Sequence, residues 1–305
     1  MKRRNFIIKS LAASAFVAGS PMFLSGCQSS LKGKRLVILH TNDMHSHIDP
    51  FTEGRNKGFG GMAARAAAVA QVRSQEENVL LLDVGDVFQG TPYFNMFGGE
   101  LELKLMSEMG YEATTVGNHE FDNGLDGLKK AMQHADFPYL SANYDFSKNQ
   151  ISNEVQPYKI FNKGGIKVGV FGLGIKLEGL VNSAMYGNTI VSDPIAVAKE
   201  MVQELNAKQC DLIVCLSHLG YDYGDAPYPS DVRLAQEVSE IDVILGGHTH
   251  TFMDEPLLLT NSQGFTTTIN QVGWAGINLG RIDVEFTESA KGIASSEVIM
   301  LNNRV

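Results

Sequence analysis

The chain has 305 residues, of which 25 are basic and 34 acidic, giving a formal net charge of −9 near neutral pH. This balance disfavours nucleic-acid binding through a basic surface, because such surfaces neutralise phosphates with clustered Lys and Arg. With 44% hydrophobic residues, the length suffices for one large core or two tightly joined halves.

The first 26 residues have the composition of an export signal. The pair Arg3-Arg4 precedes an apolar stretch from Leu11 to Leu24, which is too short for an ordinary membrane span. The arginine pair resembles a twin-arginine signal. Because Lys2 stands where that pattern prefers Ser or Thr, the general secretory route stays open.

A short motif at the end of this segment indicates lipid attachment. Leu24-Ser25-Gly26-Cys27 resembles a bacterial lipobox, which implies that Cys27 becomes the lipidated first residue of the mature chain. Gln28 follows and favours outer-membrane retention under an enterobacterial-type sorting rule. We therefore expect an exported protein at the periplasmic face of the cell envelope, anchored to the membrane through Cys27, with residues 27–35 as a tether.

The remainder of the chain alternates between strand-like and helix-like segments. Apolar, β-branched runs predict buried strands at 36–39, 79–82, 113–116, 212–216 and 243–245. Helix-like segments lie near 61–77, 97–109, 124–135, 193–208 and 230–239. This alternation predicts an α/β protein. Three β-rich segments without intervening helices, Thr266–Val272, Ile277–Phe286 and Ser296–Leu301, predict a second sheet packed on the first.

Residue types that commonly bind divalent metals occur just after each of the five predicted strands. The stretches are Asp43-Met44-His45, Gly85-Asp86, Gly117-Asn118-His119-Glu120, Ser217-His218 and Gly246-Gly247-His248-Thr249-His250. Carboxylate and imidazole donors suit Zn, Mn, Fe or Co, and the lack of cysteine in these stretches disfavours an iron–sulfur role. Because α/β proteins build their sites at the carboxyl ends of strands, we expect the five loops to meet at one sheet edge.

Each motif alone has an ordinary structural explanation. Asp43 could cap a turn, Asp86 could start a helix and Asn118 could be a turn residue. His248 and His250 lie two residues apart, which on a strand places both on one face, as core or surface histidines. The occurrence of all five motifs in one chain favours the metal site.

Other catalytic motifs fit less well. Gly164 to Gly169 superficially suggests a nucleotide-binding loop, but it lies between two β-like runs and therefore predicts a hairpin turn. Ser217 lacks the Gly-x-Ser-x-Gly context of a hydrolase nucleophile, and the sequence contains no Walker motif.

Taken in order, the five motifs resemble those of the calcineurin-like metallophosphoesterases. The stretch Gly117 to Asp122, followed by Asn123-Gly124, is similar to the 5′-nucleotidase branch, and the resemblance runs from about Leu36 to Arg281. It implies a four-layer α/β/β/α sandwich, in which two packed mixed sheets are flanked by helices, and a catalytic domain over residues 36–305.

The resemblance also implies two divalent metal ions, with Zn, Mn, Fe and Co as candidates. Seven residues would hold them: Asp43, His45 and His250 one ion, Asn118, His218 and His248 the other, and Asp86 both. An anionic bridge offsets the repulsion between two cations about 3.5–4 Å apart. Some family members carry Gln where this chain has His250, so its metal preference could differ.

The implied activity is phosphomonoester hydrolysis by a metal-bridging hydroxide, since coordination lowers the pKa of water from about 15.7 towards about 7. His119 would protonate the leaving oxygen or stabilise its charge, and Asp122 would orient the His119 ring. The expected substrate is a small phosphorylated molecule, foremost a nucleotide. Alternatives are another phosphate, a UDP-sugar or a sulfur ester, or a catalytically weak metal-binding subunit of a two-chain nucleotidase.

Recognition of a nucleoside has no assigned residues at this level. Many 5′-nucleotidases carry a second, C-terminal domain that clamps the nucleoside between aromatic side chains, whereas this sequence stops at Val305. A separate chain could supply that domain. Trp274 is the only tryptophan, and Phe252 and Phe265 could equally be core residues.

Overall fold

The computed structural model describes residues 31–287 and 291–302. The chain divides into residues 1–30 and a compact unit from Leu31 to Val305. The expected export signal and Cys27 lie outside the described residues. Within the described ranges, no helix is both long and apolar enough to cross a membrane.

The first of the two main sheets has four strands in the order β15-β14-β1-β2. Their bounds are Lys291–Met300, Asn278–Phe286, Arg35–Thr41 and Val79–Asp83. Strand β1 runs parallel to β2 and antiparallel to β14. The first two metal-binding motifs therefore leave neighbouring strands in the same direction.

The second main sheet has six strands in the order β12-β13-β11-β10-β8-β7. Their bounds are Leu257–Thr260, Thr266–Asn270, Val243–Gly246, Leu212–His218, Ile166–Gly174 and Tyr158–Lys163. The four inner strands are parallel, and the two edge strands are antiparallel to their neighbours. A smaller sheet joins β3 (Thr114–Thr115), β4 (Tyr139–Leu140) and β6 (Val155–Gln156), and β5 (Tyr144–Asp145) pairs with β9 (Ile190–Val191).

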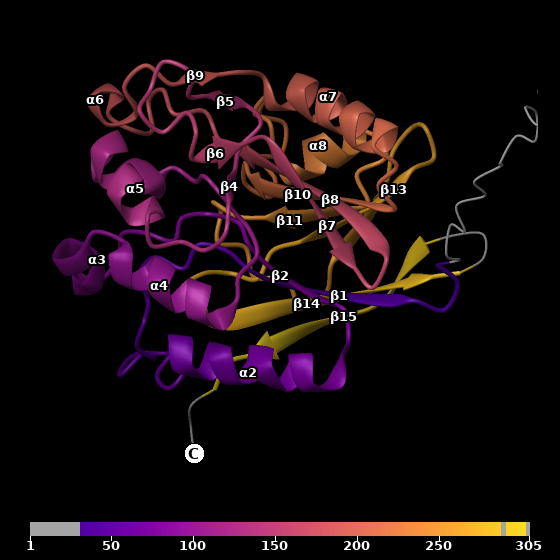
Figure 1. Ribbon diagram of the computed structural model, residues 1–305, viewed down its shortest axis with the longest axis horizontal. Coiled ribbons are helices and arrows are strands. Elements are labelled where there is room, and N and C mark those ends of the chain that lie inside the picture. The colour runs from indigo at the N-terminus through magenta and orange to yellow at the C-terminus, as the bar shows by residue number, and fades with distance from the viewer. Residues whose placement is uncertain (1–30, 288–290, 303–305) are drawn as a thin grey trace, which may run out of the picture. The chain divides into compact units, whose positions relative to one another are not determined.

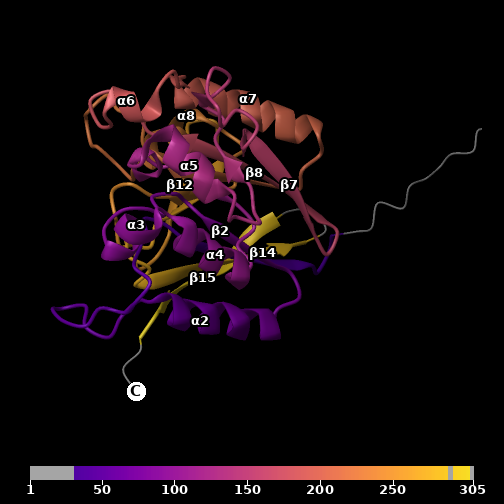
Figure 2. The ribbon, with the colours of Figure 1, turned by 60° about the vertical axis from the view of Figure 1, so that its left-hand side comes forward.

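Successive side chains along each strand point to opposite faces of its sheet, and this alternation divides the core into layers. In β1, Leu36 and Ile38 face the second sheet, whereas Val37 and Leu39 face helices. Helices α2 (Met62–Gln75) and α4 (Glu100–Met109) cover the outer side of the first sheet, and α7 (Pro194–Ala207) and α8 (Asp231–Glu237) cover that of the second. Both ribbon views show this order of layers (Figure 1, Figure 2). The predicted arrangement of two mixed sheets flanked by helices is confirmed.

Two expectations about the sheets are wrong. The segment Thr266–Val272 does not join the late strands, because β13 pairs with β11 in the six-stranded sheet. The five motif-bearing strands also belong to three sheets rather than one: β1 and β2, β3, and β10 and β11. Apolar runs identify a strand but leave its partner open, since pairing is decided by contacts distant in sequence.

The helices follow the predicted segments with one break. The expected helix over 97–109 begins only at Glu100, as α4, because Gly98 and Gly99 have φ values of 62° and 95° and separate it from an additional short helix, α3 (Pro92–Phe97). The remaining helices are η1 (His119–Phe121), α5 (Gly124–Met132) and α6 (Ser183–Tyr186). The hairpin predicted at Gly164-Gly165 is confirmed: it joins β7 to β8, and both glycines have positive φ, as a type I′ turn requires.

The residues just before β1 contact the folded unit. Leu31 packs against the core between the two sheets, and the amide of Gly33 donates to the carbonyl of Phe286. The part of the expected tether that the structure describes thus lies on the unit itself.

His40 links the two main sheets at the end of β1. Its Nε2 lies 3.1 Å from Nδ2 of Asn270 in β13, and its side chain is fully buried. An amide nitrogen can only donate, so the ring accepts and Nε2 carries no proton. Burial lowers the pKa of His40 to about 3, so the folded protein keeps the ring neutral.

This linkage predicts how stability depends on pH. An unfolded chain protonates His40 with its ordinary pKa near 6.5, so the stability due to the neutral ring is present above that pH and is lost as the pH falls towards 3. In urea unfolding between about pH 6 and 4, His40→Gln should lose stability less steeply than the wild type, by up to about 1.4 kcal/mol per pH unit. His134→Gln, at the surface, is the control. Equal slopes for His40→Gln and wild type would contradict the assignment.

Candidate metal centre

The structure brings all five motif loops together. There are three groups of side chains whose donor atoms, within each group, lie within 4.8 Å of one another: Asp43, His45 and His250; His45, Asp86 and His119; and Asp86, His218 and His248. His45 and Asp86 each belong to two groups, so the donors form one continuous cluster. Asn118 joins it through His248, whose Nδ1 lies 2.8 Å from the Asn118 side-chain oxygen.

Backbone conformation is unusual at this cluster. Asp43, His45, Asp86, His248 and His250 all have positive φ, between 46° and 72°. Such conformations cost roughly 1–3 kcal/mol each for residues with a side chain and persist only where the surroundings impose them. Five of the seven expected ligands are therefore held in conformations that chain propensity alone would not select.

Two glycines allow the loops after β2 and β3 to touch. A Cβ at Gly85 would lie 2.7 Å from the Gly117 amide nitrogen, closer than non-bonded atoms approach. Gly85 also has a φ of 79°, which glycine adopts at little cost. These loops carry Asp86 and Asn118, so their close approach places an expected bridging ligand beside an expected ligand of the second ion.

His218 and Asp86 provide a direct test of whether a cation fits. His218 Nδ1 lies 2.6 Å from the Val84 carbonyl oxygen, which can only accept, so Nδ1 carries the proton of the neutral ring. The lone pair on Nε2 then points at Asp86 Oδ2, 3.1 Å away, and both side chains are buried. Two lone pairs at that distance repel unless a cation lies between them.

The electrostatics of this pair agree with that conclusion. Burial opposes the charged form of His218, yet the Asp86 carboxylate more than offsets it and raises the pKa of His218 to about 10. Burial likewise opposes ionisation of Asp86, but His218 lowers the pKa of Asp86 below its usual range. The position therefore attracts positive charge, as a site for a divalent ion must.

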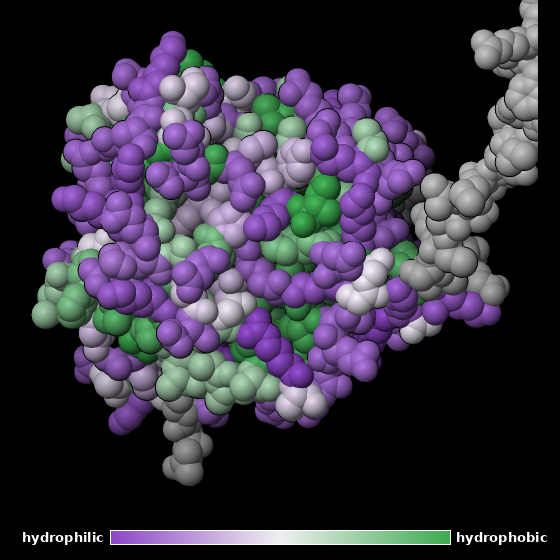
Figure 3. All heavy atoms as spheres, viewed as in Figure 1, coloured by the Kyte–Doolittle hydropathy of each residue, from purple (hydrophilic) through white to green (hydrophobic). Residues whose placement is uncertain are grey.

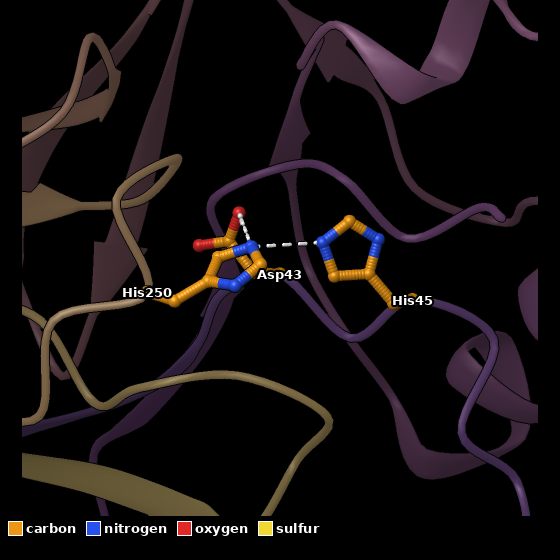
Figure 4. A group of neighbouring side chains, drawn as sticks. All are labelled: Asp43, His45 and His250. Carbon is orange, nitrogen blue, oxygen red and sulfur yellow. Dashed lines mark hydrogen bonds and ion pairs between the residues drawn. The ribbon is translucent and has the colours of Figure 1, made fainter. Parts of the chain in front are cut away.

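On the other side of the cluster, His45 and His250 face one another (Figure 4). Their Nε2 atoms lie 2.9 Å apart, and Nε2 of His250 is 3.4 Å from Asp43 Oδ1. Burial lowers the pKa of His45, which favours the neutral ring that metals bind. His45 Nδ1 lies 3.3 Å from the Phe88 carbonyl oxygen and donates to it, leaving Nε2 available to an ion.

His119 lies beside the donors with its own carboxylate partner. Its Nδ1 is 2.9 Å from Asp122 Oδ2, and its backbone amide donates to Asp86 Oδ1 at 2.8 Å. The hydrogen bond to Asp122 raises the pKa of His119, which favours the protonated ring. This arrangement suits an acid that delivers a proton to a departing oxygen.

Glu120, which has no predicted role, joins the loop after β2 to the loop after β3. Its buried carboxylate accepts hydrogen bonds from the amides of Gly117 at 2.6 Å and of Asp86 and Val87 at 2.9 Å each. Three backbone donors from two motif loops therefore meet at one side chain. A carboxylate directly after Asn118-His119 was the only sequence signal for this role.

Trp274, which has no predicted role, packs against one of the expected ligands. Its ring stacks on His250, with centroids 5.6 Å apart and planes within 6° of parallel. The edge of His47, an additional histidine of the first motif loop, meets the same indole at 5.3 Å. Trp274 thus restricts the orientation of His250 by packing.

Residues 36–252 match the family model of calcineurin-like phosphoesterases. Snake venom 5′-nucleotidase of Gloydius brevicauda is 33% identical over 313 residues, covering 95% of this chain and 52% of that protein. A 5′-nucleotidase of Vibrio cholerae is 34% identical over 331 residues, covering 98% and 58%.

A solved structure gives the same result in three dimensions. The 5′-nucleotidase precursor from Thermus thermophilus superposes with a TM-score of 0.80 at 33% identity, covering 88% of this chain and 55% of that one. The chain thus spans about half the length of the curated relatives it matches. The family model covers more than half of the chain, so the protein belongs to the calcineurin-like phosphoesterase family.

Proposed function

We propose that the protein is a dinuclear metal-dependent phosphomonoesterase that acts on nucleotides, as a 5′-nucleotidase does. The observation that carries the proposal is the continuous donor cluster with Asp86 at its centre, shared between two groups of ligands. A single-ion site would not need a carboxylate common to two sets of donors. The names of the relatives support the substrate class.

In this proposal, Asp43, His45 and His250 hold one ion, Asn118, His218 and His248 hold the other, and Asp86 bridges them. Bound divalent ions supply Lewis acidity towards the phosphoryl oxygens and lower the pKa of the attacking water. Metal identity is open among Zn, Mn, Fe and Co, which all accept nitrogen and oxygen donors.

The protein's own contribution to the chemistry is proton delivery and orientation. His119 donates its proton to the leaving oxygen, and Asp122 keeps the ring protonated and fixed. A serine nucleophile is not required: the buried Ser217 hydroxyl donates to Asp231 at 2.5 Å and is committed to that contact. Glu120 holds the loops of both ions without binding either.

The same donor set would serve other esters, so specificity needs its own assay. A panel of nucleoside monophosphates, UDP-glucose, an aryl phosphate and an aryl sulfate separates nucleotidase activity from the UDP-sugar and sulfur-ester alternatives. The paired His119 and Asp122 argue against a catalytically weak subunit. If a separate chain supplies nucleoside recognition, adding it should lower KM for nucleotides far more than for the aryl phosphate.

We also propose that the protein is exported and anchored through a lipid on Cys27 at the periplasmic face of the envelope. The support is the signal-like composition of residues 1–26 and the lipobox-like stretch that ends at Cys27. The twin-arginine and general secretory routes both remain compatible with that stretch.

The metal assignment predicts the behaviour of Asp86→Ala. Elemental analysis of the reconstituted wild type should find close to two transition-metal equivalents per chain. Asp86→Ala should lose activity and most of the metal, because the bridge between the cations is removed. Asp136→Ala, which removes an exposed carboxylate elsewhere, should retain both. Two full equivalents in Asp86→Ala would exclude the bridging role.

The acid role predicts a leaving-group dependence for His119→Ala. Turnover should fall by roughly 10²–10⁴ while the metal content is kept, as expected for loss of a positioned proton donor. The loss should be smaller for 4-nitrophenyl phosphate than for an alkyl phosphate, because a good leaving group needs less protonation. His134→Ala serves as the matched control. Equal losses for both substrates would rule out proton donation.

The anchoring proposal predicts the fractionation of Cys27→Ser. The wild type should sediment with membranes, since acyl chains contribute about 0.8 kcal/mol per buried CH₂, and Cys27→Ser should appear in the soluble fraction. Cys210→Ser, at a half-buried free thiol, controls for loss of a cysteine. Continued sedimentation of signal-cleaved Cys27→Ser would refute the lipobox assignment.

A further inference from the structure

A cavity of about 830 Å³ opens beside the metal centre, with His248 in its wall. Three segments form the rest: the connection from β8 to α6, the start of α7, and the loop between β10 and α8. Its size falls within the usual range of small-molecule sites, about 300–1,000 Å³. A second groove of about 790 Å³ lies between α2 and α4, where Figure 3 shows small apolar residues at the surface, but none of the expected ligands lines it.

The cavity wall is rich in aromatic and apolar side chains. Tyr186, Tyr223 and Tyr228 line it together with Leu177 and Leu219. Tyr223 and Tyr228 meet edge to face, with centroids 5.9 Å apart, and the Tyr223 hydroxyl donates to the Leu219 carbonyl at 2.9 Å. Tyr223 is therefore fixed to the end of the β10 segment and supports its neighbour.

Tyr228 itself is largely uncovered. It is 62% exposed, although it lies between Pro227 and Pro229, which restrict the backbone on both sides. An aromatic ring that is exposed to solvent at the edge of an apolar cavity offers a face on which a planar ring can stack.

The charged side chains named in the cavity lining already have partners within the protein. Lys176 pairs with Glu178 at 2.7 Å, and the Asp193 carboxylate caps the first turn of α7. The wall thus offers no unpaired cation for a second phosphate among the lining residues. Its chemistry fits an uncharged, planar group rather than an anion.

Two features connect the cavity with the candidate metal centre. One wall contains His248, an expected ligand. Another belongs to α6, which packs against α5: a Cβ at Gly124 would lie 3.6 Å from Met185 Sδ. Helix α5 begins at Gly124, two residues after Asp122, so the cavity is connected to the segment that carries His119 as well as to His248.

We propose that this cavity binds the nucleobase of a nucleoside 5′-monophosphate, with Tyr228 stacking on the base and Tyr223 supporting that ring. The inference rests on the proposed phosphomonoesterase function and names its substrate subsite. It assigns base recognition to this chain, so that no second chain is needed for that step.

Binding of adenosine to metal-free protein, measured by calorimetry, tests the subsite without catalysis. Adenosine carries the base but no phosphate, so the metals contribute nothing. Tyr228→Ala should weaken its binding by about 5- to 100-fold, the range expected for loss of one base-stacking ring. Tyr228→Phe keeps the ring face and should retain most of the affinity. Leu258→Ala, on β12 and also 62% exposed, should match the wild type.

Steady-state kinetics of the metal-loaded protein provide a second test of the subsite. The wild type should have a higher kcat/KM for AMP than for ribose 5-phosphate, which shares the reacting group but lacks the base. The ratio of these two values should fall in Tyr228→Ala, through KM rather than kcat, and should be kept in Leu258→Ala.

The outcomes separate the two proposals. If no phosphomonoester is hydrolysed but adenosine binding depends on Tyr228, the function fails and the subsite stands. If AMP and ribose 5-phosphate are hydrolysed equally well, or if adenosine binds Tyr228→Ala as it binds the wild type or binds neither, the subsite is refuted while the hydrolase stands. Matching thermal unfolding curves for the Tyr228 variants and the wild type confirm that the fold is kept.

Discussion

The centre depends on one buried carboxylate that lies close to several imidazoles. Asp86 is buried, and its two oxygens face His218 Nε2 and the backbone amide of His119. Its own amide is bound by Glu120, which also binds the amides of Val87 and Gly117. An isolated charge in that position would be strongly unfavourable, so its neighbours must supply positive charge or hydrogen-bond donors. This one requirement explains why three loops from different parts of the chain meet there.

The layered fold makes the meeting geometrically feasible. The two main sheets pack face to face through Leu36, Ile38 and their counterparts on β10 and β11, so the carboxyl ends of strands from both sheets reach the same region. Positive φ at Asp43, His45, Asp86, His248 and His250 is then imposed by the fold and presents donors that relaxed loops would not hold in place.

The net charge of the chain and the local charge at the candidate site act in opposite directions on an anionic substrate. The chain is acidic overall, which opposes the approach of an anionic phosphate at long range. Under the proposed function, attraction of a phosphate therefore has to come from the bound metal ions and from His119, whose pKa is raised by its hydrogen bond to Asp122. Packing completes the site: Trp274 stacks on His250, and tyrosine and apolar side chains line the cavity that has His248 in its wall.

The sequence by itself was enough to identify the candidate site residues and the strands that precede most of them. The apolar runs before Asp43, Asp86, His218 and His248 predicted the strands correctly, and the glycine pair at Gly164-Gly165 predicted its hairpin, because strand alternation and turn chemistry are local properties. Only the tertiary structure decided that β13 joins β11 rather than β14, that the five loops leave three sheets, that Glu120 holds two of these loops, that Trp274 stacks on His250 and that Tyr228 lines the same cavity as His248. These features arise from contacts between residues far apart in the chain, whose energies come from burial and close packing and therefore leave no periodic signal in the sequence.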